Sequence, residues 1–338
     1  PSKDVYKKLL KNGINVDKCC FCKYDSLAGK DDMMFLFELL SKFKDKNNNP
    51  AVITANAVVA NPDFEKIGKS NFENYHYELL PETLIKKTNN NIKLWHEGIN
   101  SGVFYPQFHG REHLNVKRWL RYLRRGSKEL LLAFENEMFG ISTTISKENN
   151  PSFMAALAVD ENDDYEFHKD TLIDGYKIFE NIFKYSSKSF IAPNCIWQEK
   201  HEKVLADLGV KYLQGSYIQN ESLPKQKNTN KKYHFMGEKN KFDQTYLIRN
   251  CTFEPSLNTN KDWLDCCLKD INTAFKHNKP AVICTHRVNF IGVIDSKNRD
   301  KNLKLTEKLF KEILKKWPNV EFMSSDKLGE LIINEQVQ

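Results

Sequence analysis

Two histidines four residues apart, His109 and His113, are the side chains best able to do chemistry together. They follow an extended run at 102–108 and precede a helix that the sequence predicts over 115–125. A spacing of four places both imidazoles on one face of a helical turn, where both can reach one divalent ion. The alternative interpretation is two polar residues at a helix start, one capping it and one solvated. The rest of the chain has to decide between them.

The elements that would position these histidines alternate along the chain. Apolar runs predict strands near residues 51, 103, 153, 188, 210, 244, 281 and 320. Amphipathic stretches predict helices at 2–10, 33–40, 115–125, 128–138, 166–183, 199–208, 263–277, 302–316 and from 326. Strands separated by helices are typical of a parallel sheet. We therefore expect an α/β protein, a distorted (β/α) barrel of about seven strands.

This barrel is expected to form a single domain over 1–338. Residues 1–32 would be an insertion, and the polar stretch 219–232 a mobile loop. The stretches on either side of Gly237 are expected to form a hairpin.

Polar side chains follow several of the predicted strands. In parallel α/β folds the carboxyl ends of the strands carry the reactive loops, so these side chains are expected to converge. This convergence favours the metal interpretation of the histidine pair. The residues concerned are Asn56, His109, His113, Asn194, Trp197, Arg249, Asn250, Glu254, His286, Arg287 and Asn289.

The order of these groups resembles the polysaccharide deacetylase (NodB-homology, carbohydrate esterase) family from about residue 33 onward. The matches are His109 and His113 to its HxxxH metal motif, Ile283-Cys284-Thr285-His286 to its Leu-x-x-His motif, Asp262-Trp263 to its Asp-Trp pair, residues 190–193 with Trp197 to its Arg-x-Pro region, and residues 320–328 to its closing strand.

The resemblance implies a metal-dependent hydrolase that removes acetyl groups from a sugar or polysaccharide. The metal, zinc or a similar divalent ion, would be held by His109 and His113. His286 would be the general acid, with Asp262 supporting its charge. The other strand-end residues, Asn56, Asn194, Trp197, Asn250, Glu254, Arg287 and Asn289, are expected to bind the acetylated carbohydrate.

The chain departs from the family pattern at two points. No predicted strand ends in the Asp-Asp pair that gives the family a metal ligand and the catalytic base; we expect this pair upstream of Pro1, with Asp25 as the substitute ligand within the chain. Ile191 stands where the family has the arginine that orients the base, and Arg249 or Arg287 is expected to replace it.

Two further functions stay open. Residues 109–113 also spell HxxEH, an inverted zinc-peptidase signature with Glu112 as base, which requires the motif to lie inside a long helix. The missing Asp pair is also compatible with a catalytically inactive glycan-binding protein on the same barrel.

Composition excludes other classes. The 51 lysine and arginine residues exceed the 44 acidic ones but are scattered, whereas a nucleic-acid binder gathers them into a stripe. No apolar run approaches the length of a membrane span. The eight cysteines do not form a disulfide scaffold; we interpret Cys251, Cys266, Cys267 and Cys284 as buried thiols. A reducing, cytoplasmic location is expected.

Overall fold

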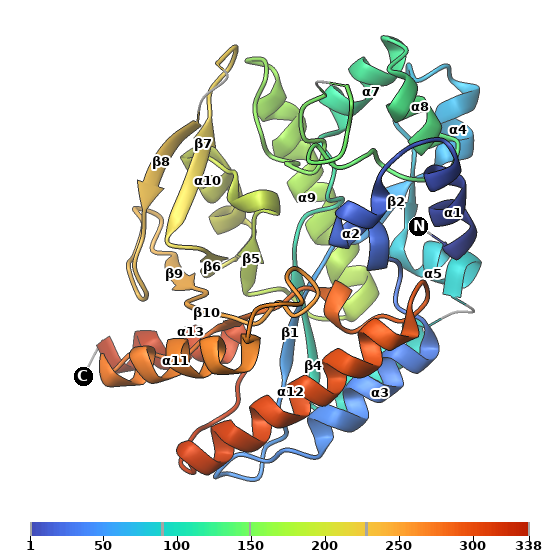
Figure 1. The fold of residues 1–338 in the computed structure, drawn as a ribbon. Helices are drawn as coiled ribbons and strands as arrows, with labels where there is room; N and C mark the ends of the chain where they lie inside the picture. Colours follow the sequence, from blue (N-terminus) through green and yellow to red (C-terminus); the bar gives the residue numbers. More distant parts are fainter. Residues whose placement is uncertain (1, 89–90, 149, 227–228, 337–338) are drawn as a thin grey trace. The chain divides into compact units, whose positions relative to one another are not determined.

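The computed structural model describes residues 2–88, 91–148, 150–226 and 229–336 (Figure 1). Its α-helices are α1 (Lys3–Lys11), α2 (Cys20–Tyr24), α3 (Lys30–Ser41), α4 (Phe64–Lys69), α5 (Leu80–Thr88), α6 (Ile92–Asn100), α7 (Val116–Arg124), α8 (Lys128–Phe134), α9 (Asp164–Phe183), α10 (Glu199–Asp207), α11 (Trp263–Lys276), α12 (Ser296–Lys316) and α13 (Ser325–Gln336). Short 3-10 helices are η1 (Val16–Lys18), η2 (Pro193–Cys195) and η3 (Arg287–Asn289).

The strands are β1 (Ile53–Ala57), β2 (Ala60–Pro62), β3 (Tyr77–Leu79), β4 (Phe104–Phe108), β5 (Ser189–Ile191), β6 (Tyr212–Gly215), β7 (Ile218–Ser222), β8 (Thr229–Tyr233), β9 (Thr245–Ile248), β10 (Cys251–Thr252) and β11 (Ile283–Cys284). Five of them form a sheet in the order β1-β4-β5-β6-β9. Its pairs β4–β5, β5–β6 and β6–β9 are parallel. Every residue of β5, β6 and β9 is buried, as expected when a parallel sheet is covered on both faces.

The predicted α/β class with a parallel sheet is therefore confirmed. The barrel is not: the strand order of this sheet, as described, runs from β1 at one end to β9 at the other. A barrel of about seven strands stays a prediction from the sequence.

A second parallel pair, β10–β11, positions Cys284 and the residues that follow the two strands. Cys251 lies opposite Ile283 and Thr252 opposite Cys284. The side chain of Asn250 bridges the two strands, since its Oδ1 accepts from the Val282 N–H (2.8 Å) and its Nδ2 donates to the Pro280 carbonyl (2.9 Å). The side-chain amide of Asn250 thus holds the backbone of this strand pair, and its predicted role in substrate binding stays a prediction.

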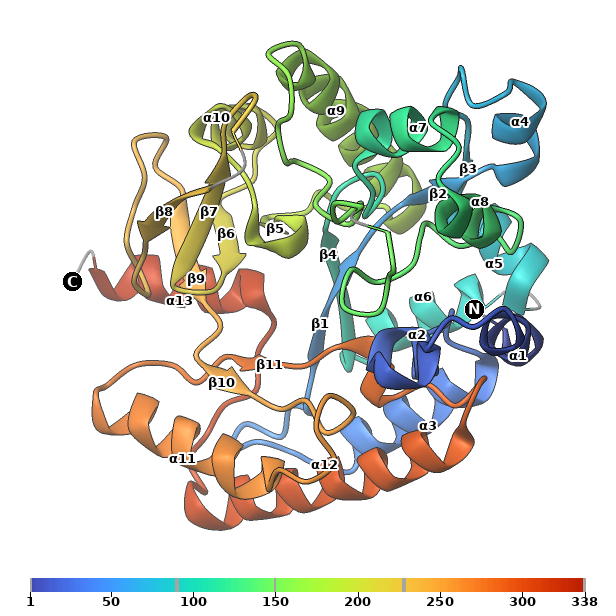
Figure 2. The ribbon, with the colours of Figure 1, turned by 45° about the horizontal axis from the view of Figure 1, so that its top comes forward.

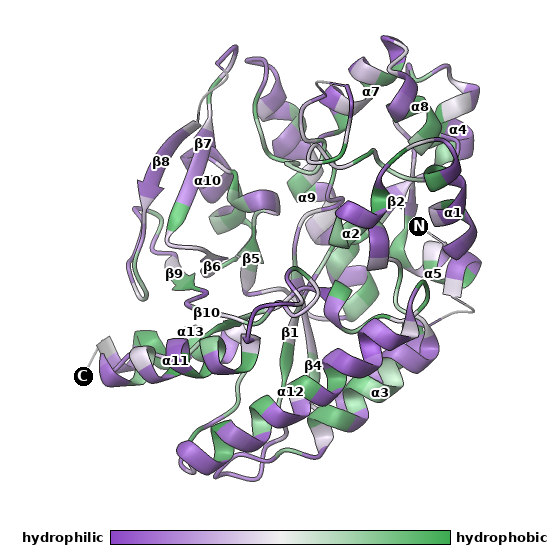
Figure 3. Ribbon diagram, viewed as in Figure 1, coloured by the Kyte–Doolittle hydropathy of each residue, from purple (hydrophilic) through white to green (hydrophobic). Residues whose placement is uncertain are grey.

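Packing divides the chain into two units. The first contains residues 1–55, 84–105 and 249–327, and the second contains 56–83, 106–248 and 328–338. In the first unit α3 and α12 lie side by side (Figure 1). Hydrophobic and hydrophilic residues alternate along α12 (Figure 3), whose buried residues are Asn302, Thr306, Leu309 and Ile313. In the second unit a cluster around Trp119, which is fully buried, packs α7 and α8 together.

Most predicted helices form where their caps indicate. Ser2 caps α1, because its Oγ accepts from the Val5 N–H, and Asn115 caps α7 in the same way through Arg118. Gly209, with φ of 87°, follows the end of α10. α12 starts six residues before the predicted 302, because the side chain of Asp295 caps it. None of the helices in the described part of the chain is long and apolar enough to cross a bilayer.

The strand predicted at 153–159 is wrong. This apolar run is mostly buried but irregular, because side chains satisfy its backbone in place of a neighbouring strand. Asn115 Nδ2 donates to the carbonyls of Ala155 (3.3 Å) and Ala158 (2.8 Å). The Val159 N–H donates to Ser222 Oγ at 2.7 Å.

The last predicted strand, 320–323, is also irregular. Its backbone is bonded to a turn rather than to a strand, since the Phe322 N–H donates to Asp45 Oδ2 at 2.9 Å. The Lys46 N–H likewise donates to the Val320 carbonyl at 3.3 Å.

The stretch 219–232, predicted to be a mobile loop, largely forms the antiparallel hairpin β7–β8 (Figure 2). Ile218 pairs with Tyr233 at one end and Ser222 with Thr229 at the other, while residues 227–228 lie outside the described residues. The hairpin predicted around Gly237 is confirmed in part: the Gly237 N–H donates to the Tyr246 carbonyl at 3.0 Å, and Lys239 forms an antiparallel bridge with Thr245.

Candidate functional site

The histidine pair lies in the loop between β4 and α7, not on a helical turn as predicted. α7 begins only at Val116, beyond both histidines. The two rings still meet, with centroids 4.9 Å apart at an interplanar angle of 72°. Gly110, between them, adopts φ of 102°, a left-handed backbone conformation that favours glycine. A loop with this turn therefore brings the rings of His109 and His113 together, where the sequence predicted a helical turn.

His109 is oriented by the backbone of the sheet. Its Nδ1 lies 2.7 Å from the Ile191 carbonyl oxygen, and its own N–H donates to the Ala57 carbonyl at 3.0 Å. Because a carbonyl oxygen only accepts, Nδ1 must carry the proton, so Nε2 of the neutral ring carries the lone pair. Histidines that ligate metals are commonly held in this manner. His109 is therefore oriented as a metal-ligating histidine would be, and the prediction that His109, His113 and Asp25 hold a divalent ion stays a prediction.

The third ligand is not identified by geometry. Among the described residues, neither histidine belongs to a group of three His, Cys, Asp or Glu side chains whose ligand atoms all lie within 4.8 Å of one another. Asp25, the predicted substitute, accepts from Arg287 through both oxygens, at 3.0 Å each. This carboxylate raises the pKa of Arg287. Metal binding by Asp25 would have to displace that ion pair.

Glu112 is not placed as a catalytic base. It is 2 % exposed, and Arg111 binds it through Nε (2.6 Å) and Nη2 (3.0 Å). Burial raises the pKa of Glu112, with Arg111 opposing that rise. Arg111 also donates to Asp174 at 2.9 Å. Since the HxxEH residues lie in a loop and Glu112 is held in a buried ion pair, the structure contradicts the inverted zinc-peptidase alternative.

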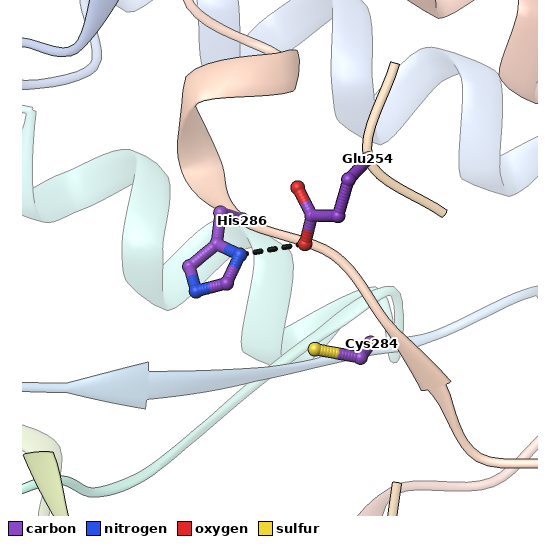
Figure 4. A group of neighbouring side chains, drawn as sticks. All are labelled: Glu254, Cys284 and His286. Carbon is purple, nitrogen blue, oxygen red and sulfur yellow. Dashed lines mark hydrogen bonds and ion pairs between the residues drawn. The ribbon is translucent and has the colours of Figure 1, made fainter. Parts of the chain in front are cut away.

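A second group of reactive side chains lies in the first unit, at the ends of β10 and β11. His286 Nδ1 lies 2.6 Å from Glu254 Oε1 (Figure 4). Glu254 is 2 % exposed, whereas half of the His286 side chain is exposed. Asn289 Nδ2 donates to the other oxygen of Glu254 at 2.8 Å, and the ring of Phe21 meets the imidazole edge-on at 5.6 Å. A buried carboxylate thus orients a histidine whose Nε2 can exchange a proton.

This geometry bears on three predicted roles. Asp262 Oδ1 accepts from the Asp265 N–H at 2.9 Å and caps α11, and its predicted support of His286 stays a prediction. Glu254, predicted to bind substrate, is the partner of His286. Asn289 is fully buried and also accepts from the Ser256 N–H at 2.9 Å, so it positions Glu254 rather than contacting a substrate. The only sequence signal for Glu254 was its position after the strand predicted near residue 244.

The remaining predicted residues have varied surroundings. Trp197 is 3 % exposed and donates to Glu202 at 2.8 Å, so it is a core residue and not a surface for a sugar ring. Asn56 Oδ1 accepts from Gln214 at 3.1 Å. Asn194 is exposed in η2 with φ of 56°. Arg249 directly follows β9, and its predicted role in orienting a base stays a prediction.

Cys284 joins the second group. One ligand atom from each of Glu254, Cys284 and His286 lies within 4.8 Å of the other two. The sequence interpretation of four buried thiols holds for Cys251 and Cys267, whereas Cys266 and Cys284 are half-buried. Treating Cys284 as a core thiol is the reason the sequence missed this group.

Comparisons with known proteins add little. No protein-family model matches the chain. No curated protein matches it in sequence. Among solved structures it is similar to one described as "putative polysaccharide deacetylase from Mycobacterium smegmatis", with a TM-score of 0.46 and 10% identity, over 98% of this chain and 87% of that one. A likeness this weak does not establish a shared fold or activity.

Proposed function

We propose that this protein is a metal-dependent hydrolase that removes acetyl groups from a sugar or polysaccharide. The observation that carries the proposal is the hydrogen bond between His109 Nδ1 and the Ile191 carbonyl, which leaves the lone pair of the neutral ring on Nε2, in a ring whose centroid lies 4.9 Å from that of His113. The histidine held by Glu254 adds the proton donor that breaking an amide or ester bond requires. The order of motifs in the sequence supports the same class.

Each group has a defined role in this proposal. His109 and His113 hold the divalent ion, for which zinc suits imidazole ligands. A bound ion of this kind polarises the acyl carbonyl and lowers the pKa of a water molecule. His286, protonated, donates from Nε2 to the leaving amine or alkoxide. Glu254 keeps the Nδ1 proton in place and stabilises the imidazolium, because a buried carboxylate interacts strongly with a nearby positive charge.

Metal content and acetate release from N-acetylated and O-acetylated sugars test the proposal. We expect bound zinc in the purified protein, and its loss in His109→Ala and His113→Ala. His277→Ala is the matched control, because His277 is exposed at the end of α11 and should change neither quantity. A full-length protein that binds no metal and releases no acetate from any of these sugars would refute the enzyme.

The second candidate is a catalytically inactive glycan-binding protein. It is favoured by one observation, that no third ligand joins the histidine pair among the described residues. It predicts binding of acetylated oligosaccharides without turnover. Sugar binding that survives His109→Ala, with no acetate released by the unaltered protein, would support it.

A further inference from the structure

Glu254, Cys284 and His286 bring three kinds of metal ligand to one place. Figure 4 shows the thiol of Cys284 beside the carboxylate and imidazole, which are joined by their hydrogen bond. The proposed function uses Glu254 and His286 but gives no task to the thiol. A thiolate, an imidazole and a carboxylate are together the donors that zinc binds, and thiolate favours soft ions over magnesium or calcium.

The distances suit a metal ion after a small adjustment. Bonds of about 2.0–2.3 Å in a tetrahedral site place neighbouring donor atoms roughly 3.3–3.6 Å apart. Nδ1 of His286 and Oε1 of Glu254 are 2.6 Å apart, and one ligand atom from each of the three residues lies within 4.8 Å of the other two. The half-exposed His286 side chain has room to move, so the three donors can adjust to one ion, with water as the fourth ligand.

The backbone holds two of the ligands in register. Cys284 lies opposite Thr252 in the β10–β11 pair, and the Phe253 N–H donates to the Cys284 carbonyl at 2.9 Å. Glu254 follows Phe253 directly, so its position relative to Cys284 is set by the strand pair. The bond from Asn289 Nδ2 then orients the carboxylate from behind, as hydrogen bonds around metal ligands commonly do.

We propose that Glu254, Cys284 and His286 form a second metal site, composed of different residues from the histidine pair and selective for a thiophilic divalent ion such as Zn²⁺. When His286 is an imidazolium, the ion replaces two protons, one from the thiol and one from Nδ1, and both are released to solvent without oxidation or reduction; Nε2 keeps its proton. Because Glu254 and His286 then bind the ion, His286 no longer acts as a proton donor. Occupancy of this site inhibits the hydrolase, a consequence that rests on the proposed function.

Cobalt titration of the metal-free full chain tests the site directly. Co²⁺ bound by a thiolate gives a charge-transfer band, so we expect this band in the unaltered protein. In Cys284→Ser we expect the Cys284-dependent band to be lost and the ion to bind at least about tenfold more weakly. Cys266→Ser is the matched control, since Cys266 is also half-buried in the first unit but lies on α11 outside the group.

His286→Ala is a second variant. Because the His286 side chain is half exposed, its removal should leave the fold intact, and we expect it to weaken Co²⁺ binding similarly. If Co²⁺ binding and the band are the same in Cys284→Ser, His286→Ala and Cys266→Ser, the second site does not exist. Reduced binding in the first two variants alone supports it.

The two proposals fail separately. The same titration in a His109→Ala/His113→Ala background lacks the proposed catalytic ion, so Cys284-dependent Co²⁺ binding there supports the second site even if no acetate release is ever found. If acetate is released but Zn²⁺ inhibits the unaltered protein and Cys284→Ser at the same concentration, the inhibitory role is refuted. We expect Cys284→Ser to need at least about tenfold more Zn²⁺ for equal inhibition.

Discussion

His286 and Glu254 form the closest ring-to-carboxylate contact of the candidate site, with Nδ1 2.6 Å from Oε1. The carboxylate of Glu254 is buried, whereas the imidazole of His286 is half exposed to solvent. A buried carboxylate that is also bonded to Asn289 has little freedom to turn away. The imidazole is therefore presented in one orientation, with Nε2 available for proton transfer.

Glu254→Gln tests this relationship. The amide oxygen can still accept from Nδ1, but the neutral side chain no longer stabilises an imidazolium. We expect kcat for acetate release to fall by roughly 10²-fold, with KM little changed and metal content unaltered. Glu254→Asp, which retains the charge, should recover part of the rate. Equal kcat in Glu254→Gln and the unaltered protein would show that the pair has no role in catalysis.

Glu112→Gln tests the buried ion pair with Arg111. Removing one charge leaves the guanidinium buried with less compensation, so we expect the free energy of unfolding to fall by about 3 kcal/mol, measured by urea denaturation. Zinc content of the folded protein should stay the same. The exposed pair Glu65–Lys69 on α4 provides the control, since Glu65→Gln should cost less than about 1 kcal/mol. Abolished turnover at full stability would instead restore Glu112 as a catalytic base.

Local signals predicted much of the framework. β4 ends at Phe108, at the predicted boundary, and α7 begins after its predicted cap, because alternation of apolar residues and capping depend on neighbours in the chain. Residues 153–159 have the apolar content of a strand, yet their backbone is bonded by Asn115 and Ser222, far away in sequence. Such partners cannot be found from a local pattern.

The candidate site shows the same division. His109 and His286 were found because each directly follows a strand. The partner of His286 was assigned to Asp262, which is nearer in sequence, whereas the structure places Glu254 there. Asp25 and Arg287 are 262 residues apart and still form a bidentate ion pair. Position in the chain indicates which residues face a strand end, but tertiary packing decides which of them meet.

Two buried histidines in the second unit predict loss of stability in acid. His168 and His201 are 3 % and 1 % exposed, and His168 Nδ1 lies 3.2 Å from His201 Nε2. The Gln198 N–H donates to His201 Nδ1 at 3.0 Å, so His201 must donate from Nε2 to His168. Burial lowers the pKa of His168 from 6.5 to about 4 and that of His201 well below 6.5.

Because both rings are neutral when folded, the unfolded chain takes up protons first as pH falls. Stability is therefore fully present above about pH 6.5 and declines toward about pH 4, by on the order of 3 kcal/mol for His168. Urea denaturation at a series of pH values in this window measures the slope. His168→Gln should flatten it, whereas His277→Ala, at an exposed position, should not. A slope unchanged by His168→Gln would assign the acid sensitivity to other groups.

Variants of Asp262 distinguish its role as the cap of α11 from a role in stabilising charge on His286. Its Oδ1 accepts from the Asp265 N–H at the start of α11, so Asp262→Ala should lower the free energy of unfolding by about 1 kcal/mol. Asp262→Asn is the matched variant, since asparagine caps as well as aspartate but carries no charge. We expect Asp262→Asn to change the free energy of unfolding by no more than about a few tenths of a kcal/mol and to leave kcat for acetate release unchanged. A rate that falls in Asp262→Asn at unchanged stability would mean that this carboxylate, and not Glu254 alone, stabilises the charge on His286.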